Sequence, residues 1–113
     1  MKEVKSLDEV REFVKFYDRC VVVYSSLRCP PCRRLHAAYK DSSEIAGVPA
    51  ICLTIEYLKP EELRSLADDP DLVLRAVPTT AIYVGGKIVH RVVGFRDKNS
   101  FEREIRAALR LVP

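Results

Sequence analysis

Apolar residues recur every three or four positions near the start of the chain, with charged residues between them. The apolar set comprises Leu7, Val10, Phe13, Val14 and Tyr17. This spacing predicts an amphipathic helix that ends near Asp18. Ser6 and Glu9 mark its start, because they have the spacing of a capping box in which two unpaired backbone N–H groups find partners.

Two more helices are predicted farther along the chain. Pro60 is followed by two glutamates, and this combination is typical of a first helical turn, where Pro loses no hydrogen bond and acids face the helix dipole. Apolar residues at helical spacing over residues 100–111 predict the last helix, with Asn99 or Ser100 as its N-cap.

Short apolar runs between these helices predict strands. Residues 20–24 and 48–55 are almost continuously apolar, which is typical of strands buried on both faces of a sheet. Residues 81–84 and 87–93 flank a Gly-Gly pair, which is a strong signal for a two-residue hairpin turn. A further short strand is predicted at Val4.

The order of these elements predicts the fold class. Early strands that alternate with helices pair in parallel, whereas the hairpin strands pair antiparallel. We therefore expect an α/β protein with a single mixed central sheet of four to five strands, flanked by helices on both faces. The chain has 113 residues, which fits one domain over residues 1–113.

Composition and charge exclude several classes of function. The net charge of +3 arises from charges that alternate in sign, without the basic stripe of a nucleic-acid-binding protein. The apolar run near the N-terminus is far shorter than the roughly 18 residues of a membrane span, and we expect no secretory signal. We therefore expect a cytoplasmic protein with no nucleic-acid or membrane partner.

Four cysteines are the candidates for chemistry: Cys20, Cys29, Cys32 and Cys52. Without an export signal a disulfide framework is not expected, so the cysteines are catalytic, metal-binding or simply buried. Cys29 and Cys32 stand out by their context. They follow a buried strand, open a helix and lie above the carboxyl end of the sheet, where open α/β folds place their sites.

The setting of Cys29 favours a reactive thiolate. A helix N-terminus offers unpaired N–H groups and a partial positive charge. Arg28, Arg33 and Arg34 surround the pair, and such settings lower the pKa of a cysteine from about 8.5 to about 3.5–7.5.

The two residues between the cysteines, Pro30 and Pro31, place the start of a helix here, because Pro is tolerated only in the first turn. Proline has no N–H, so the amide and thiol of Cys32 are the nearest local donors to the sulfur of Cys29. The prolines also stiffen the loop and restrain the separation of the two sulfurs.

The whole chain resembles thioredoxin. The element order agrees from end to end, and four motifs match: Cys29-Pro30-Pro31-Cys32 at the start of the second helix, Val77-Pro78-Thr79 before the hairpin, Gly85-Gly86 at the turn and Val93-Gly94 near the end of the last strand. The resemblance implies the thioredoxin fold and an exchange of a dithiol for a disulfide with protein substrates.

The resemblance also implies roles for the two cysteines. Cys29 would be the exposed nucleophile that attacks a substrate disulfide. Cys32 would be the resolving thiol that releases the reduced substrate and leaves a Cys29–Cys32 disulfide. Such a monomer needs no bound cofactor, and a reductase or a small thiol would supply its electrons.

A substrate groove is implied beside the cysteines. The match at Val77 and Pro78 implies a cis peptide bond that faces the cysteine pair, and the substrate would lie extended along the backbone of Val77 as an added strand. Gly94 would permit its close approach, and Phe95 would supply an apolar contact.

Three positions depart from the family's pattern. Arg28 stands where the family usually has Trp. Val23 and Cys52 stand at the positions of the family's buried Asp and its partner Lys, so the ion pair thought to handle the proton of the resolving thiol is missing. Arg28 and Cys52 are therefore candidate modulators, and the direction of the reaction (reduction, oxidation or isomerisation) stays open.

His36 is a candidate for the missing proton acceptor. It lies four residues after Cys32, so the two share a helix face, and a neutral imidazole titrates in the right range. The alternative interpretation is a partly buried histidine with an ordinary hydrogen bond.

The remaining cysteines are predicted on opposite faces of the sheet. Side chains alternate along a strand, so Cys20 faces away from Val23, whereas Cys52 lies on the Val23 side. No Cys20–Cys52 disulfide is expected. Cys52 is either a small buried hydrophobe or a third thiol beneath the active pair.

Two rival functions belong to other classes. Cys29, Cys32 and His36 have ligand-like spacing, and Cys52 would complete a zinc set, although the prolines and the lack of a second close Cys pair argue against a metal. The other rival is a non-catalytic thioredoxin-like binding or chaperone module, whose partners would bind without either cysteine.

Overall fold

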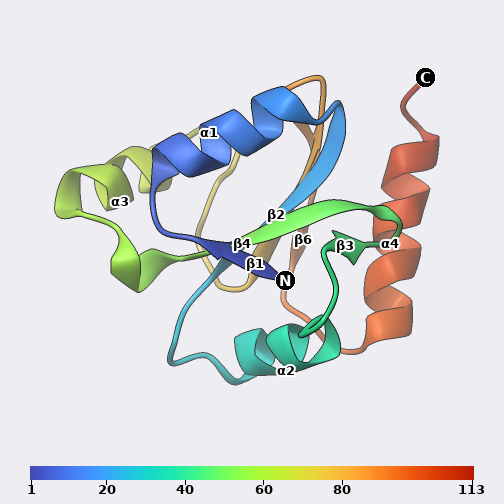
Figure 1. Cartoon of the computed structure of the whole chain (residues 1–113), viewed down its shortest axis with the longest axis horizontal. Helices are drawn as coiled ribbons and strands as arrows, with labels where there is room; N and C mark the ends of the chain where they lie inside the picture. The colour runs from blue at the N-terminus through green and yellow to red at the C-terminus, as the bar shows by residue number, and fades with distance from the viewer.

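A mixed sheet forms the centre of the computed structural model, which describes residues 1–113 (Figure 1). The strands are β1 (Lys2–Val4), β2 (Arg19–Ser25), β3 (Glu44–Ile45), β4 (Val48–Thr54), β5 (Thr79–Val84) and β6 (Lys87–Val93). The helices are α1 (Leu7–Phe16), α2 (Pro30–Ala38), α3 (Pro60–Ala67) and α4 (Lys98–Arg110), and a short 3-10 turn, η1, covers Ile55–Tyr57.

Five of the strands lie side by side in the order β1-β4-β2-β5-β6, and the two-residue β3 pairs with the start of β4. The strands β1, β4 and β2 run parallel, while β5 and β6 are antiparallel to their neighbours. Helices cover both faces (Figure 1). The predicted fold class is therefore confirmed, and β3 is the one strand that the sequence did not indicate.

The central strand, β2, has no face in contact with water. Every residue from Cys20 to Ser25 is buried, because β4 and β5 flank the strand and helices cover both sides of it. This position explains why residues 20–24 form a continuous apolar run instead of alternating between apolar and polar residues.

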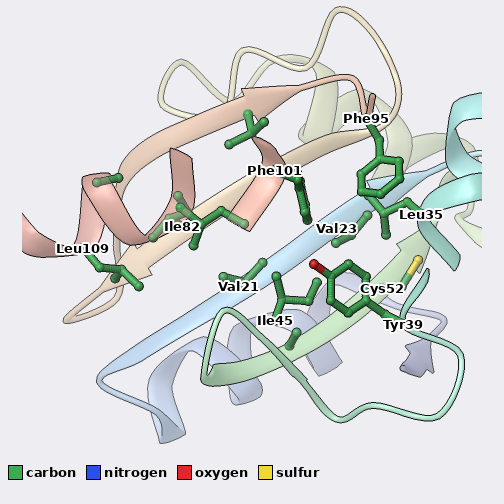
Figure 2. Packing of buried hydrophobic residues seen from close by; sticks show 14 residues of the cluster. Val21, Val23, Leu35, Tyr39, Ile45, Cys52, Ile82, Phe95, Phe101 and Leu109 are labelled. Atoms are coloured by element: carbon green, nitrogen blue, oxygen red, sulfur yellow. The ribbon is translucent and has the colours of Figure 1, made fainter. Parts of the chain in front are cut away.

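Two apolar clusters fill the space between the sheet and the helices. One lies under α2 and α4 and includes Val23, Cys52, Leu35 and Ile105 (Figure 2). The other lies under α1 and α3 and includes Cys20. Cys20 and Cys52 thus lie on opposite faces of the sheet, as predicted.

The ends of the outer helices differ from the prediction. Helix α1 ends at Phe16, two residues early, and α4 begins at Lys98. The N-cap of α4 is Asp97, so the prediction of Asn99 or Ser100 was wrong. The Asp97 carboxylate accepts a hydrogen bond from the backbone N–H of Ser100 at 2.8 Å. Its negative charge also interacts favourably with the positive end of the helix dipole, so Asp is a good N-cap here.

The burial of α4 against the sheet leads to a first prediction. Replacing Ile105, which is fully buried, in the variant Ile105→Ala should lower the free energy of unfolding by about 2–5 kcal/mol, because it leaves a cavity. Leu111→Ala is the matched control. Its side chain is 85% exposed, so its effect should stay within about 0.5 kcal/mol. Urea denaturation followed by circular dichroism measures both, and equal losses would contradict this account of the core.

Candidate active site

The thiol of Cys29 lies at the start of α2. Cys29 is the N-cap of α2 and has an extended backbone. Its sulfur accepts a hydrogen bond from the backbone N–H of Cys32 at 3.3 Å. Pro30 and Pro31 occupy the first two helical positions and have no N–H to offer. The Cys32 amide is therefore the donor that stabilises negative charge on the Cys29 sulfur, as the sequence indicated.

Cys29 is less exposed than expected. The residue is only 8% exposed, so the prediction of an exposed nucleophile was wrong. The loop before β5 covers the sulfur, and the Cys29 thiol donates a hydrogen bond to the backbone carbonyl of Val77 at 3.4 Å. A substrate that reaches Cys29 must therefore approach along this loop.

The loop before β5 is held beside the cysteines by its contact with the end of β6. The Val77–Pro78 peptide bond is cis, and the Pro78 carbonyl accepts a hydrogen bond from the N–H of Gly94 at 2.8 Å. Gly94 has a φ of +86°, a left-handed backbone conformation that glycine adopts without strain. The space beside it is open, so another chain could approach the backbone closely here.

Phe95, the expected apolar contact of the groove, is largely buried. Its ring is buried in the cluster under α2 and α4 and packs edge-on against Phe101 at 5.1 Å between centroids (Figure 2). The apolar side chains exposed near the groove are Val93, at 59%, and Leu27, at 56%. Strand alternation gives the signal for Val93, since Val92 next to it is buried.

The three arginines near the pair have different roles. Arg28 and Arg33 are exposed, as expected for charges beside the site. Arg34 is also exposed, but its guanidinium donates a hydrogen bond to the Phe95 carbonyl at 3.1 Å and so joins α2 to the segment after β6.

An acid also lies close to the loop that precedes the cysteines, which the sequence did not indicate. The Glu56 carboxylate accepts hydrogen bonds from the Ser26 hydroxyl and from the Leu27 N–H. These bonds, led by that from Ser26, lower the pKa of Glu56, and Arg28 adds to the effect.

Cys32 is buried beneath Cys29, and its environment resists ionisation. Burial is the largest effect and raises the pKa of the Cys32 thiol, and the hydrogen bond with Cys29 acts in the same direction. Hydrogen bonds from the Ser25 side chain and the Ser26 backbone oppose this rise by favouring the thiolate. Burial and these hydrogen bonds therefore act in opposite directions on the pKa of the Cys32 thiol, and burial is the larger effect.

The imidazole of His36 lies near Cys32 but contacts other residues. Its Nε2 is 3.1 Å from the Ser25 hydroxyl and 3.5 Å from the Cys52 sulfur. Burial lowers the pKa of His36 below its usual value, with a smaller opposing effect from Glu3. Ser25 is the residue that the sequence analysis missed. It is a polar residue two positions after Val23, on the same face of β2, and that alternation was the available signal.

Cys52 lies beside these groups as a buried thiol. In the sheet it is paired with Val23, so the two positions are adjacent, as the resemblance to thioredoxin implied. Burial raises the pKa of Cys52 to about 12, with Glu3 adding to the rise.

The zinc alternative is not supported by the geometry. No three His, Cys, Asp or Glu side chains are arranged so that they could hold a metal ion. In particular, Cys52 and His36 approach each other, but Cys29 and Cys32 do not complete a set around them.

The comparisons with known proteins agree with this geometry. No protein-family model and no curated protein sequence matches the chain. Solved structures do match: thioredoxin from Plasmodium falciparum has a TM-score of 0.75 at 18% identity and covers 95% of this chain and 98% of its own. A mutant thioredoxin from Halobacterium salinarum has a TM-score of 0.75 at 22% identity, covering 99% of this chain and 93% of its own.

A third match has the highest identity of the three. Thioredoxin f from spinach chloroplast has a TM-score of 0.73 at 26% identity and covers 96% of this chain and 92% of its own. The chain therefore has the thioredoxin fold, and the resemblance to thioredoxins that its motifs indicated is confirmed. No helix has both the length and the apolar character needed to cross a lipid bilayer.

The burial of the four thiols leads to a second prediction. In the native reduced protein at pH 7, iodoacetamide should modify Cys29 first and leave Cys20 and Cys52 unmodified. Burial raises the pKa of Cys20 to about 11 and that of Cys52 to about 12, so roughly one in ten thousand or fewer of these thiols is ionised at pH 7. Peptide mass spectrometry measures the order, with the urea-unfolded protein as control. Modification of Cys52 as fast as Cys29 would contradict the prediction.

Proposed function

We propose that this protein is a thiol–disulfide oxidoreductase that acts on disulfide-containing proteins, with Cys29 as nucleophile and Cys32 as resolving thiol. The observation that supports it best is the 3.3 Å hydrogen bond from the Cys32 N–H to the Cys29 sulfur. It places a thiolate-stabilising donor and a second thiol at the same helix start, which is the arrangement that disulfide exchange requires.

The reaction proceeds in two exchanges. The Cys29 thiolate attacks one sulfur of a substrate disulfide, and the other substrate sulfur leaves as a thiolate. The Cys32 thiolate then attacks the Cys29 sulfur, which breaks the mixed disulfide and forms Cys29–Cys32. Two electrons pass from the dithiol to the substrate. A reductase or a small thiol returns them, and no bound cofactor is needed.

The substrate binds in extended form along the loop that ends at Pro78. The Val77 carbonyl, which the Cys29 thiol contacts at 3.4 Å, becomes available for a substrate N–H when Cys29 reacts. Val93 and Leu27 are exposed apolar side chains that can contact a substrate, and the open space at Gly94 admits the substrate backbone. Such strand addition provides affinity through main-chain hydrogen bonds.

A third prediction separates this function from a binding or chaperone module. Cys29→Ser should abolish reduction of a disulfide-containing test protein, because no nucleophile remains. Cys32→Ser should form a mixed disulfide that accumulates, because the resolving thiol is missing. Product formation and intact-mass spectrometry measure the two effects.

Cys20→Ala is the matched control, since Cys20 lies on the other face of the sheet and its loss should leave the reaction unchanged. Full activity in Cys29→Ser would contradict the proposed function. Partner binding that survives the loss of both cysteines, without any exchange, would favour the binding module.

A further inference from the structure

We propose that the substrates of this protein carry acidic residues beside the disulfide, and that exposed arginines around Cys29 select for them. The inference rests on the proposed function and names the class of protein segment that the same site accepts. Each segment of chain that surrounds Cys29 supplies one exposed arginine to this set, which we call the site arginines: Arg28, Arg33, Arg75 and Arg96.

Two of the site arginines adjoin the cysteines in the chain. Arg28 directly precedes Cys29, and Arg33 directly follows Cys32. The backbone N–H of Arg33 donates a hydrogen bond to the Cys29 carbonyl at 3.1 Å, so this residue belongs to the first turn of α2. Neither arginine forms an ion pair with a carboxylate of the chain.

The fold brings the other two site arginines to the groove. Arg75 lies two residues before Val77, whose carbonyl accepts a hydrogen bond from the Cys29 thiol at 3.4 Å. Arg96 lies two residues after Gly94, whose N–H donates a hydrogen bond to the same loop at 2.8 Å. Two residues span at most about 7 Å of chain, so the backbone of both arginines lies beside the groove.

The stretches of chain that form the groove contain no acid. Residues 25–39 and 72–96 include neither Asp nor Glu, and all 16 acids of the chain lie outside them. Charges of both signs are mixed along the rest of the sequence, but they are segregated here. This segregation leaves the positive charge around Cys29 without opposite charges from the same segments.

Two acids adjoin the site arginines from other positions, and both are hydrogen-bonded within the fold. Glu56 accepts hydrogen bonds from Ser26 and Leu27, and Asp97 caps α4. Asp97 also lies 3.9 Å from Arg96, but the Arg96 side chain stays 87% exposed. The site arginines therefore keep their guanidinium groups available to a ligand.

An extended substrate in the groove brings its own side chains close to these guanidinium groups. The substrate cysteine must reach Cys29, and residues one or two positions from that cysteine lie within about 7 Å of it along the strand. A carboxylate at such a position can form two parallel hydrogen bonds with a guanidinium. The selected substrate is therefore an extended segment with Asp or Glu within two residues of its disulfide.

The test compares three peptides that each carry one cysteine, blocked as a mixed disulfide with 2-thiopyridine. The two residues on either side of that cysteine are glutamate, glutamine or lysine. The Cys29 thiolate attacks the peptide sulfur, the disulfide bond breaks, and the leaving sulfur departs as uncharged 2-thiopyridone, which absorbs light. Stopped-flow mixing with the reduced full-length protein gives the second-order rate constant. Division by the rate of the same peptide with dithiothreitol removes differences in intrinsic reactivity.

The glutamate peptide should react fastest and the lysine peptide slowest. At low ionic strength we expect their normalised rate constants to differ by about 10- to 100-fold, the lower part of the range for electrostatic steering. In 1 M salt the Debye length falls to about 3 Å, so the difference should nearly vanish.

Single variants locate the preference on the site arginines. Arg28→Gln and Arg75→Gln should each lower the rate ratio of the glutamate to the glutamine peptide by about 1.5- to fivefold, the range for exposed charge pairs. The double variant should lower it further. The glutamine peptide is the reference within each variant, so an effect of the substitution on the Cys29 sulfur itself cancels.

Arg110→Gln is the matched control. It removes the same charge from an exposed position, but Arg110 ends α4, twelve residues from the start of the helix at Lys98. That length corresponds to about 18 Å, so the rate ratio should match that of the wild type. The control separates a local effect from the loss of net charge.

The outcomes separate the substrate class from the proposed function. Equal normalised rates for the glutamate and lysine peptides at low ionic strength would overturn the substrate class and leave the function standing. So would a preference that Arg28→Gln and Arg75→Gln do not lower, or that Arg110→Gln lowers as much. If the wild type releases no 2-thiopyridone from any peptide, the proposed function itself is wrong, and the substrate class fails with it.

A small anionic thiol is the other occupant that these charges could attract. Mercaptosuccinate, blocked with the same 2-thiopyridine group, tests it. The extended peptide should react faster because it also bonds to the loop before β5 and contacts Leu27 and Val93. An equal normalised rate for mercaptosuccinate and the glutamate peptide would overturn the assignment to a protein segment.

Discussion

The exclusion of water from both faces of β2 is the constraint on which the rest of the structure depends. Because β4, β5 and the helices enclose this strand, a charge along it would need a buried partner, and the cost of removing both from water is several kcal/mol per ion. Residues 20–24 are therefore apolar, and the polar residues Arg19 and Ser25 stand at the two ends of the strand. Ser25 is thus the polar residue at the end of β2 that leads on to Cys29 and α2.

The helices and strands that pack against β2 could be predicted from sequence because burial leaves a periodic pattern. The helical spacing in α1 and α4 and the apolar run of β2 reflect which face each element buries. The errors lie where a local contact, and not periodicity, decides the structure. The N-cap of α4 depends on which carboxylate reaches the Ser100 amide, and β3 depends on a turn at Ala46 and Gly47.

The site was predictable to the extent that its residues are neighbours in sequence. Cys29 and Cys32 form one motif, and their hydrogen bond follows from the two prolines between them. The burial of Cys29 was not predictable, because it results from a contact with Val77, more than forty residues away. The burial of Phe95 was not predictable either, because its ring packs against Phe101 on α4. The contact of His36 with Ser25 joins residues 11 apart, and only the fold brings their side chains together.

Val23 and Cys52 form an apolar pair in the sheet, and Ser25 and His36 form a polar pair next to Cys52. Replacing a buried ion pair by well-packed apolar groups is often neutral or stabilising, by about 1–4 kcal/mol, so Val23 and Cys52 need not weaken the fold. The Ser25 hydroxyl at the end of β2 and the His36 imidazole on α2 are 3.1 Å apart, and burial lowers the pKa of His36, which favours its neutral form. The polar atoms of Ser25 and His36 therefore stay outside the apolar cluster that contains Val23 and Cys52.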